Sequence, residues 1–194
     1  MQARHSDRKK YFNEQALTTR KYVIPYLQDL IEISENTSVL EIGCGEAGNL
    51  VPFLDMGCKR VVGIDISEGR IENGQLYHSD HPNYKNLELI AEDIYDTETT
   101  EEFDIIISRD VIEHIPNQEK FMNRCRDFMK PNGLYFIGFP PWYNPFGGHQ
   151  QLLKHKLFSK LPYFHIIPRS LYKGLLRLMG ESDAKIKGML EIYD

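Results

Sequence analysis

Short apolar runs alternate with amphipathic stretches through the middle of the chain. The apolar runs predict five strands, at Val39–Ile42, Arg60–Ile64, Leu87–Ala91, Phe103–Ile107 and Leu134–Phe139. Strands that are apolar on both faces are typical of a parallel sheet with helices on both sides, and parallel neighbours need right-handed crossovers. We therefore expect an α/β protein with a doubly wound sheet, strand order 3-2-1-4-5 and helices on both faces.

Helical periodicity fills the intervals between these strands. One helix is expected to begin near Gly48, and Ser67 is placed to cap a second. Asn117 can cap a third helix, which Pro131–Gly133 is expected to end with Gly133 as its C-terminal cap. The apolar face of that third helix consists of Phe121, Met122, Cys125, Phe128 and Met129.

The first 36 residues also have a helical pattern. Its apolar positions are Val23, Ile24, Leu27, Leu30 and Ile31, and Pro25 either starts a helix or kinks it. An earlier helix around Tyr11 and Phe12 has two interpretations. It packs against the edge of the sheet, which we favour, or it forms a flap over a ligand with Tyr11 and Arg20 facing it.

The stretch Val39–Gly48 joins the first strand to a helix through a Gly-x-Gly-x-x-Gly turn. Gly43 and Gly45 permit dihedrals closed to other residues and let a ligand approach the main chain, while the following helix offers free N–H groups. A tight turn without a ligand has the same glycine pattern, so the context decides. The second strand ends in Asp65, which completes the layout of a Rossmann-like nucleoside-binding sheet.

Acidic residues follow the ends of four strands: Glu41, Asp65, Asp93 and Asp110. In a doubly wound sheet these ends face one crevice. Asp is unfavourable in strands and neighbouring carboxylates repel each other, so stability does not explain the group. Each acid alone could be a helix cap, but together they suit a ligand with ribose hydroxyls, an exocyclic amine and a positive charge.

The length and composition of the chain are those of a single globular domain. The chain has 194 residues, of which 41% are hydrophobic and 26% charged, as expected for one soluble globular domain. No run approaches the roughly 20 apolar residues of a membrane span, and the first twenty residues lack the apolar centre of a secretion signal, so we expect a cytoplasmic protein. Cys44, Cys58 and Cys125 form no paired motif, which argues against disulfides and against a metal site.

The charge is unevenly distributed. A net charge of −5 gives no general reason to expect binding to DNA or RNA. Between positions 150 and 187, however, eight basic residues face only two acidic ones. This segment is interpreted as a recognition site for an anionic acceptor, a contact with an acidic membrane surface, or a solvated helix face.

The chain is expected to have three parts within one domain: a helical cap at 1–36, a Rossmann-like core at 37–141 and a lid or substrate-side segment at 142–194. The last part opens with an aromatic, Pro/Gly-rich loop that leaves the carboxyl end of the fifth strand. A substrate wall and an ordinary connection with a buried Trp142 explain this loop equally well.

Five motifs in order resemble the class I S-adenosylmethionine-dependent methyltransferases, and among them the small-molecule group that includes the ubiquinone and menaquinone biosynthesis methyltransferases. They are Glu41–Gly48, Asp65-Ile66, Glu92-Asp93-Ile94, Asp110–Ile115 and Lys130–Gly133. The resemblance covers about 39–141. The final helix and antiparallel strand pair of that family are not visible, so either the chain is truncated or they lie beyond Asp194.

The resemblance implies that S-adenosylmethionine is the cofactor and assigns its contacts. Glu41, Gly43, Cys44 and Gly45 would line the methionine part, with Arg109 beside it. Asp65 would hold the ribose diol and Asp93 the adenine amine, and Ile66 and Ile94 would sandwich the adenine ring. The loop departs from the commonest family pattern at Ala47, where glycine is frequent, and alanine fits there if the dihedrals are helical.

A dinucleotide dehydrogenase is the competing explanation of the glycine loop. Its pyrophosphate would favour a neutral or basic environment at the helix N-terminus. Glu41 and Glu46 make this loop acidic instead. A cationic sulfonium without phosphate suits that acidity better.

Methyl transfer is an in-line displacement, so alignment supplies much of the catalysis, and a hydroxyl acceptor also needs a base. His114, just after the fourth strand, is the first candidate for that base. Its alternative role, slightly favoured, is to cap the turn and pack under the loop that follows the fifth strand. Tyr143 and His149 in that loop are the second choice.

The sequence therefore predicts a methyltransferase that acts on a small-molecule acceptor through oxygen, the acceptor being anionic or linked to a lipid or sugar. A second hypothesis is a cofactor-binding but catalytically silent partner subunit. A third is an RNA methyltransferase, which the acidic net charge disfavours. No Asn/Asp-Pro-Pro-aromatic motif follows the fourth strand, so methylation of DNA amino groups is not indicated.

Overall fold

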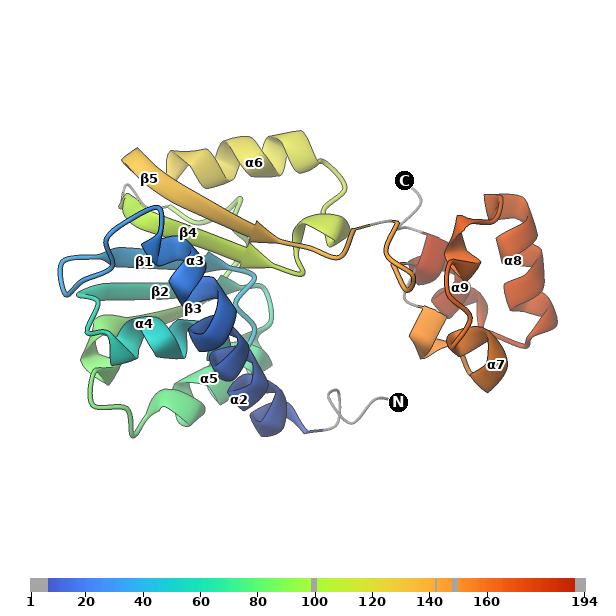
Figure 1. The fold of residues 1–194 in the computed structure, drawn as a ribbon, viewed down its shortest axis with the longest axis horizontal. Coiled ribbons are helices and arrows are strands. Elements are labelled where there is room, and N and C mark those ends of the chain that lie inside the picture. The colour runs from blue at the N-terminus through green and yellow to red at the C-terminus, as the bar shows by residue number, and fades with distance from the viewer. Residues whose placement is uncertain (1–6, 99–100, 142, 148–149, 191–194) are drawn as a thin grey trace.

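The computed structural model describes residues 7–98, 101–141, 143–147 and 150–190 (Figure 1). Its centre is a five-stranded parallel sheet in the order β3-β2-β1-β4-β5, which confirms the predicted order. The strands are β1 (Ser38–Ile42), β2 (Arg60–Asp65), β3 (Leu87–Ala91), β4 (Phe103–Arg109) and β5 (Met129–Gly138). Val39 of β1 lies opposite Val61 of β2 and Ile105 of β4, so β1 is central.

Helices cover the sheet and continue beyond it. Those before β4 are α2 (Arg8–Thr18), α3 (Ile24–Gln28), α4 (Val51–Asp55) and α5 (Glu68–His78). Those after it are α6 (Gln118–Asp127), α7 (Lys156–Ser159), α8 (Arg169–Leu178) and α9 (Asp183–Leu190). Asn117 caps α6 as predicted, because its side chain accepts a hydrogen bond from the Lys120 N–H. Ser67 precedes α5 but makes no side-chain capping bond.

A π-helical segment, Thr19–Val23, joins α2 to α3. The helical path is therefore unbroken from Arg8 to Gln28, and Pro25 lies in the first turn of α3. Because proline has no N–H to donate, a change in helical hydrogen bonding just before it is physically reasonable. Leu30, predicted on the apolar face, is exposed, whereas Val23, Ile24 and Leu27 are buried.

Alternate residues of the same strands point into two separate cores. On one face Val39, Val61 and Ile105 pack with residues that include Leu27, Phe53 and Ile71. On the other face Leu40, Val62 and Ile106 pack with residues that include Phe121, Cys125 and Phe128 of α6 and its C-terminal end. Burial on both faces explains why the strands are apolar at successive positions.

The start of β5 differs from the prediction. The strand begins at Met129, and Pro131–Gly133 lie inside it rather than ending α6. Met129 pairs with Phe103 and Leu134 with Ile105, so β5 carries three more residues than β4 between these pairs. Such a bulge accommodates proline and glycine, which regular pairing does not. The predicted role of Gly133 as a helix cap was therefore wrong.

Residues 150–190 form a separate group of helices, which we call the C-terminal lobe (Figure 1). It lies apart from the sheet, on the side to which the arrowheads of β4 and β5 point. It has its own apolar cluster, which includes Leu153, Phe164, Tyr172, Leu176 and Ile186. The described residues after β5 form helices and turns and no further strand. In the part of the chain that the structure describes, no helix has the length and apolar character to cross a membrane.

Candidate functional site

The glycine loop after β1 has the backbone that its sequence predicted. Gly43 and Gly45 have φ angles of 73° and 56°, in the region that glycine adopts most readily. A Cβ at Gly43 would lie 2.4 Å from a methyl group of Val111, so the segment after β4 fills the space on that side. A Cβ at Gly45 would meet only Arg70, at 3.9 Å. The main chain at Gly45 therefore borders space that a ligand can occupy.

Ala47 does not have the helical dihedrals under which alanine was expected to fit this loop. Its dihedrals are φ 61° and ψ 30°, which is left-handed and not helical. A left-handed alanine costs about 1 kcal/mol or more. Its methyl group is fully buried in the core beneath the loop, and this burial offsets part of the cost.

Asp65 at the end of β2 is buried and joins two segments of the crevice. One carboxylate oxygen accepts a hydrogen bond from the Gly45 N–H at 2.8 Å, and the other accepts one from the Ser67 N–H at 2.9 Å. Each oxygen retains a second lone pair. The carboxylate is thus held rigidly beside the glycine loop, in a position to accept hydrogen bonds from a diol.

Glu41 is the most deeply buried acid of the crevice, with 1% of its surface exposed. Oε1 accepts a hydrogen bond from Asn49 Nδ2 at 2.6 Å, whereas Oε2 is buried and has no hydrogen-bond partner among the described residues. Burial raises the pKa of Glu41 to about 8, against the opposing effects of Asn49 and Arg109. The carboxyl group is therefore mostly protonated at neutral pH, and a cation that approached it would favour its ionised form.

Two residues that the sequence analysis missed complete this network. Asn49 Oδ1 accepts hydrogen bonds from Arg109 Nη1 at 2.7 Å and from the Thr19 hydroxyl at 2.8 Å. Arg109 Nη1 also lies 3.1 Å from Thr19 Oγ1. Arg109 therefore reaches Glu41 through Asn49, and it ties the end of β4 to the N-terminal helices. Asn49 just after the third glycine was a detectable signal, since Asn is a weak helix former, but nothing local marked Thr19.

The N-terminal helix α2 packs on the glycine loop. A Cβ at Gly48 would lie 2.4 Å from the Phe12 carbonyl oxygen, so α2 rests directly on the glycine loop. Burial, and after it the Asp110 carboxylate, raise the pKa of Tyr11. Arg20 instead forms an ion pair with Asp55. The helix therefore packs against the protein, on the glycine loop, and a flap over a ligand stays a prediction, in which Arg20 takes no part as it stands because it pairs with Asp55.

Cys44 contributes its backbone and not its thiol to the loop. Its side chain is buried, and a Cβ at Gly63 would lie 2.8 Å from its sulfur atom. Burial, with the nearby Glu41 and Asp65, raises the pKa of the thiol well above its usual value. The group is therefore an unreactive part of the core.

The residues assigned to adenine differ in exposure. Ile66 is 78% exposed and Ile94 only 7%, because Ile94 belongs to the core on the α6 face of the sheet. Asp93 is exposed, and its Oδ1 accepts a hydrogen bond from the Tyr95 N–H at 2.9 Å. Ile66 and Asp93 are accessible to a ligand, whereas most of Ile94 packs against protein.

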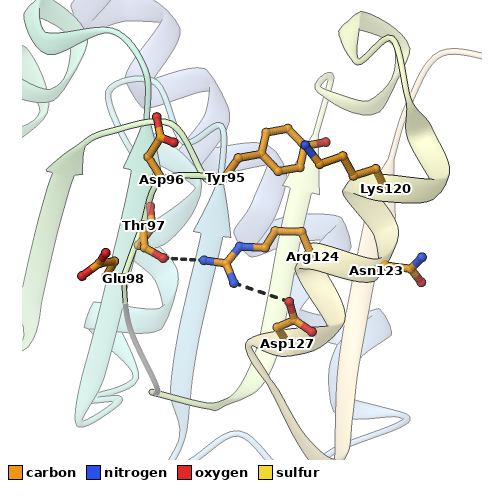
Figure 2. A pocket seen from close by; sticks show the side chains of 8 residues that line it. All are labelled: Tyr95, Asp96, Thr97, Glu98, Lys120, Asn123, Arg124 and Asp127. Carbon is orange, nitrogen blue, oxygen red and sulfur yellow. Dashed lines mark hydrogen bonds and ion pairs between the residues drawn. The ribbon is translucent and has the colours of Figure 1, made fainter.

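Arg124 of α6 holds the segment that follows β3, and in Figure 2 its guanidinium group lies between Thr97 and Asp127. Its Nε donates a hydrogen bond to the Ile94 carbonyl at 2.9 Å, and Nη2 donates to the Thr97 carbonyl. An open pocket of about 1050 Å³ surrounds it, lined by Tyr95, Asp96, Thr97, Glu98, Lys120, Asn123, Arg124 and Asp127. None of the predicted site residues lines this pocket, so we do not assign the pocket to the cofactor site. Arg124 within it has a structural role.

The candidates for a base lie on the surface. His114 is exposed, in a 3₁₀ turn at Ile112–His114, and Tyr143 is 75% exposed. His149 lies outside the described residues. Glu113, beside His114, is half-buried, and burial raises its pKa. The described residues contain no cluster of three His, Cys, Asp or Glu side chains arranged to hold a metal ion.

The sheet order is that of the Rossmann-like methyltransferase fold. PKMT2 from Rickettsia typhi, solved in complex with AdoHcy, is similar with a TM-score of 0.51 and 32% identity, over 60% of this chain and 22% of that one. Coclaurine N-methyltransferase, solved with N-methylheliamine and SAH, has a TM-score of 0.53 and 22% identity, over 61% and 35% of the two chains. The second similarity concerns the fold alone.

A family model described as a methyltransferase domain matches residues 33–173, and the chain belongs to this family. Among curated proteins, the ubiquinone biosynthesis O-methyltransferase of Rhodopseudomonas palustris is 35% identical over 107 residues. That match covers 53% of this chain and 40% of the relative. The chain thus spans about two fifths of the length of this relative.

Proposed function

We propose that this protein binds S-adenosylmethionine in the crevice at the carboxyl ends of β1, β2 and β3 and transfers its methyl group to a small-molecule acceptor. The observation that carries the proposal is the buried Glu41 carboxyl, whose Oε2 has no hydrogen-bond partner among the described residues. A buried oxygen of this kind is costly unless a ligand satisfies it. A ligand with a positive charge fits, and a pyrophosphate does not.

The other groups of the crevice fit the rest of the cofactor. The main chain at Gly45 leaves room beside Glu41, and Asp65 is fixed with lone pairs available for the ribose hydroxyls. Asp93 and Ile66 are accessible for the adenine amine and one face of the ring. PKMT2 of Rickettsia typhi, solved in complex with AdoHcy, supports the choice of cofactor.

When bound, the cofactor supplies a methyl group made electrophilic by its sulfonium. This chain holds the positively charged part beside Glu41, and the Asn49 and Arg109 network fixes the orientation of that carboxyl. Catalysis then rests on alignment of the acceptor, and a hydroxyl acceptor must lose its proton to a base. His114 is the proposed base, with Tyr143 and His149 as the second choice.

We propose that the acceptor reacts through oxygen and is anionic or attached to a lipid or sugar. The names of the curated relatives support the oxygen, and the basic C-terminal lobe supports the anionic or lipid-linked character. A cytoplasmic location stays a prediction from the sequence.

A catalytically silent, cofactor-binding subunit is the second candidate, because the described candidates for the base, His114 and Tyr143, are both exposed. Calorimetry with S-adenosylmethionine, followed by assays of S-adenosylhomocysteine release with hydroxylated aromatic, lipid and sugar acceptors and with RNA, separates these functions. Binding with release from a small molecule supports the proposal. Binding without release across the panel favours the silent subunit, release only with RNA favours an RNA methyltransferase, and the absence of binding contradicts all three.

A further inference from the structure

The C-terminal lobe differs in charge from the rest of the molecule. Residues 150–190 contain eight basic and two acidic side chains, for a formal net charge of +6. The rest of the chain contains fifteen basic and twenty-six acidic residues, for a net charge of −11. The overall value of −5 therefore hides two parts of opposite sign.

The positive charge of the lobe is exposed and little compensated. Its two acidic residues are already in ion pairs, Glu181 with Lys185 at 2.9 Å and Asp183 with Arg177 at 3.8 Å. Five other lysines have exposed side chains: Lys154, Lys156, Lys160, Lys173 and Lys187. A surface of this kind attracts anions over about one Debye length.

Large apolar side chains are exposed among these lysines. The small core of the lobe uses Tyr172 and Leu176 of α8, but it leaves Leu178 85% exposed. Other exposed apolar residues of the lobe include Leu157, Leu161, Tyr163, Ile166 and Leu171. Near α7, a leucine directly follows a lysine twice, at Lys156-Leu157 and at Lys160-Leu161.

Helix α8 separates the two kinds of exposed residue by its periodicity. Arg169, Lys173 and Arg177 follow at intervals of four and form one row, while Leu171 and Leu178, seven apart, form another. The buried Tyr172 and Leu176 occupy the side between them that faces the core of the lobe. The exposed face of the helix is thus bordered by basic residues on one side and by leucines on the other.

We propose that the C-terminal lobe docks on the surface of a bilayer that contains anionic phospholipids. Lysines on flexible stems can reach the headgroups while the leucines and Tyr163 enter the boundary with the acyl chains. The proposed contact is peripheral, because it uses only the exposed side chains of the lobe. The acidic remainder of the protein is repelled by the same surface, which orients the molecule with the lobe toward the lipid.

Other anionic partners would explain the exposed lysines but not the exposed leucines. Single-stranded nucleic acid would pair with the lysines and stack on aromatic rings, but it offers no apolar phase to leucines. Docking of the lobe onto the acidic core of a second copy would satisfy the charge and would make the protein dimerise. A bilayer accounts for the lysines and the leucines together.

The test is co-sedimentation of the full chain with vesicles of phosphatidylcholine alone or with about 30% phosphatidylglycerol, at about 0.1 M and about 0.5 M salt. We expect binding to the anionic vesicles that weakens with salt and little binding to the neutral ones. Lys156→Gln with Lys160→Gln should weaken binding about twenty-five-fold, about five-fold for each charge. Leu178→Ser should weaken it about ten-fold.

Matched variants on the core are the controls. Leu76 of α5 is 69% exposed and Lys85 is exposed, so Leu76→Ser and Lys85→Gln make the same chemical changes away from the lobe. They should bind vesicles like the wild type, and circular dichroism should show that all variants are folded. Equal binding to neutral and anionic vesicles, equal loss in the controls, or no binding to vesicles would overturn the proposal. Binding of a single-stranded RNA without vesicle binding, or dimerisation through the lobe without vesicle binding, would overturn it too.

Discussion

Arg109 at the end of β4 and Thr19 in the π-helical segment, ninety positions apart in the sequence, lie in hydrogen-bond contact at 3.1 Å. Both donate to Asn49 Oδ1, and Asn49 in turn donates to Glu41. The N-terminal helices are therefore tied by hydrogen bonds to the candidate site and do more than cover the sheet. Because π-helical turns are frequent at functional sites, the position of Thr19 is consistent with a role in holding the crevice.

Replacement of Thr19 by valine keeps the shape of the side chain and removes its hydroxyl group. We expect cofactor affinity to fall about two- to ten-fold, since one buried hydrogen bond contributes about 0.5–1.5 kcal/mol. Thr18→Val is the matched control, because the Thr18 hydroxyl bonds only to the Glu14 carbonyl of its own helix among the bonds described for it. Calorimetric titration with S-adenosylhomocysteine gives both affinities, and equal effects of the two variants would contradict a role for Thr19.

Replacement of Glu41 by glutamine should change how stability depends on pH. The folded pKa of about 8 lies above the ordinary value of 4.5, so the folded state holds this proton more tightly than the unfolded state does. The wild type therefore loses stability as pH rises from about 4.5 to about 8, by a few kcal/mol at most, and Glu41→Gln should not show this loss. Thermal unfolding of both proteins across this range measures the difference.

The same carboxyl predicts a proton linkage in binding. A cationic ligand favours ionised Glu41, so binding at pH 7 should release a proton and become tighter toward pH 8. Titrations in two buffers of different ionisation enthalpy detect the release. Glu41→Gln should bind more weakly and release no proton, whereas an unchanged proton count in this variant would assign the titration to another group.

His78 of α5 should make the protein sensitive to acid. Its ring is buried, with Nε2 3.1 Å from the Ala47 carbonyl and the ring edge-on to Phe12, and burial lowers its pKa from 6.5 to about 4. The unfolded state binds the proton more readily, so stability is lost as pH falls from about 6.5 to about 4, by about 3 kcal/mol. His78→Gln should flatten this part of the stability curve, while replacement of the exposed His155 by glutamine should leave it unchanged. A curve that keeps its slope in His78→Gln would argue against this assignment.

The left-handed conformation of Ala47 predicts an asymmetry between two substitutions. Ala47→Gly removes the strain but loses a buried methyl group, so the free energy of unfolding should change by less than about 1 kcal/mol. Ala47→Val places a β-branched residue at a positive φ angle and should destabilise the protein by more than about 2 kcal/mol. Denaturant unfolding measures both, and an unaffected valine variant would contradict the observed dihedrals.

Local patterns in the sequence were sufficient for the sheet and for the first two strand ends at the candidate site. Continuous apolar runs specify buried parallel strands, and the glycines with Glu41 and Asp65 mark the first two strand ends. The bulge in β5 was missed because Pro-Asn-Gly is an equally good helix stop until the pairing with Phe103 is known. The left-handed conformation of Ala47 could not be predicted, because an alanine gives no local indication of a positive φ angle.

The hydrogen-bond network around Glu41 could not be predicted from local sequence patterns. Asn49 lies eight positions from Glu41, but Thr19 and Arg109 meet only after the N-terminal helices have packed on the glycine loop. No periodicity or motif connects residues so distant in the chain. Burial of Ile94, which the resemblance assigned to adenine, likewise follows from the packing of α6 against the sheet.

Calorimetric titration of the intact protein and of Asp65→Ala tests most directly whether the crevice beside the glycine loop binds S-adenosylmethionine. We expect one site per chain in the wild type. The variant should bind at least ten-fold more weakly, because charge-assisted hydrogen bonds contribute about 1.5–3 kcal/mol each. No binding of S-adenosylmethionine or S-adenosylhomocysteine by the wild type, or an affinity unchanged in a folded Asp65→Ala, would contradict the account.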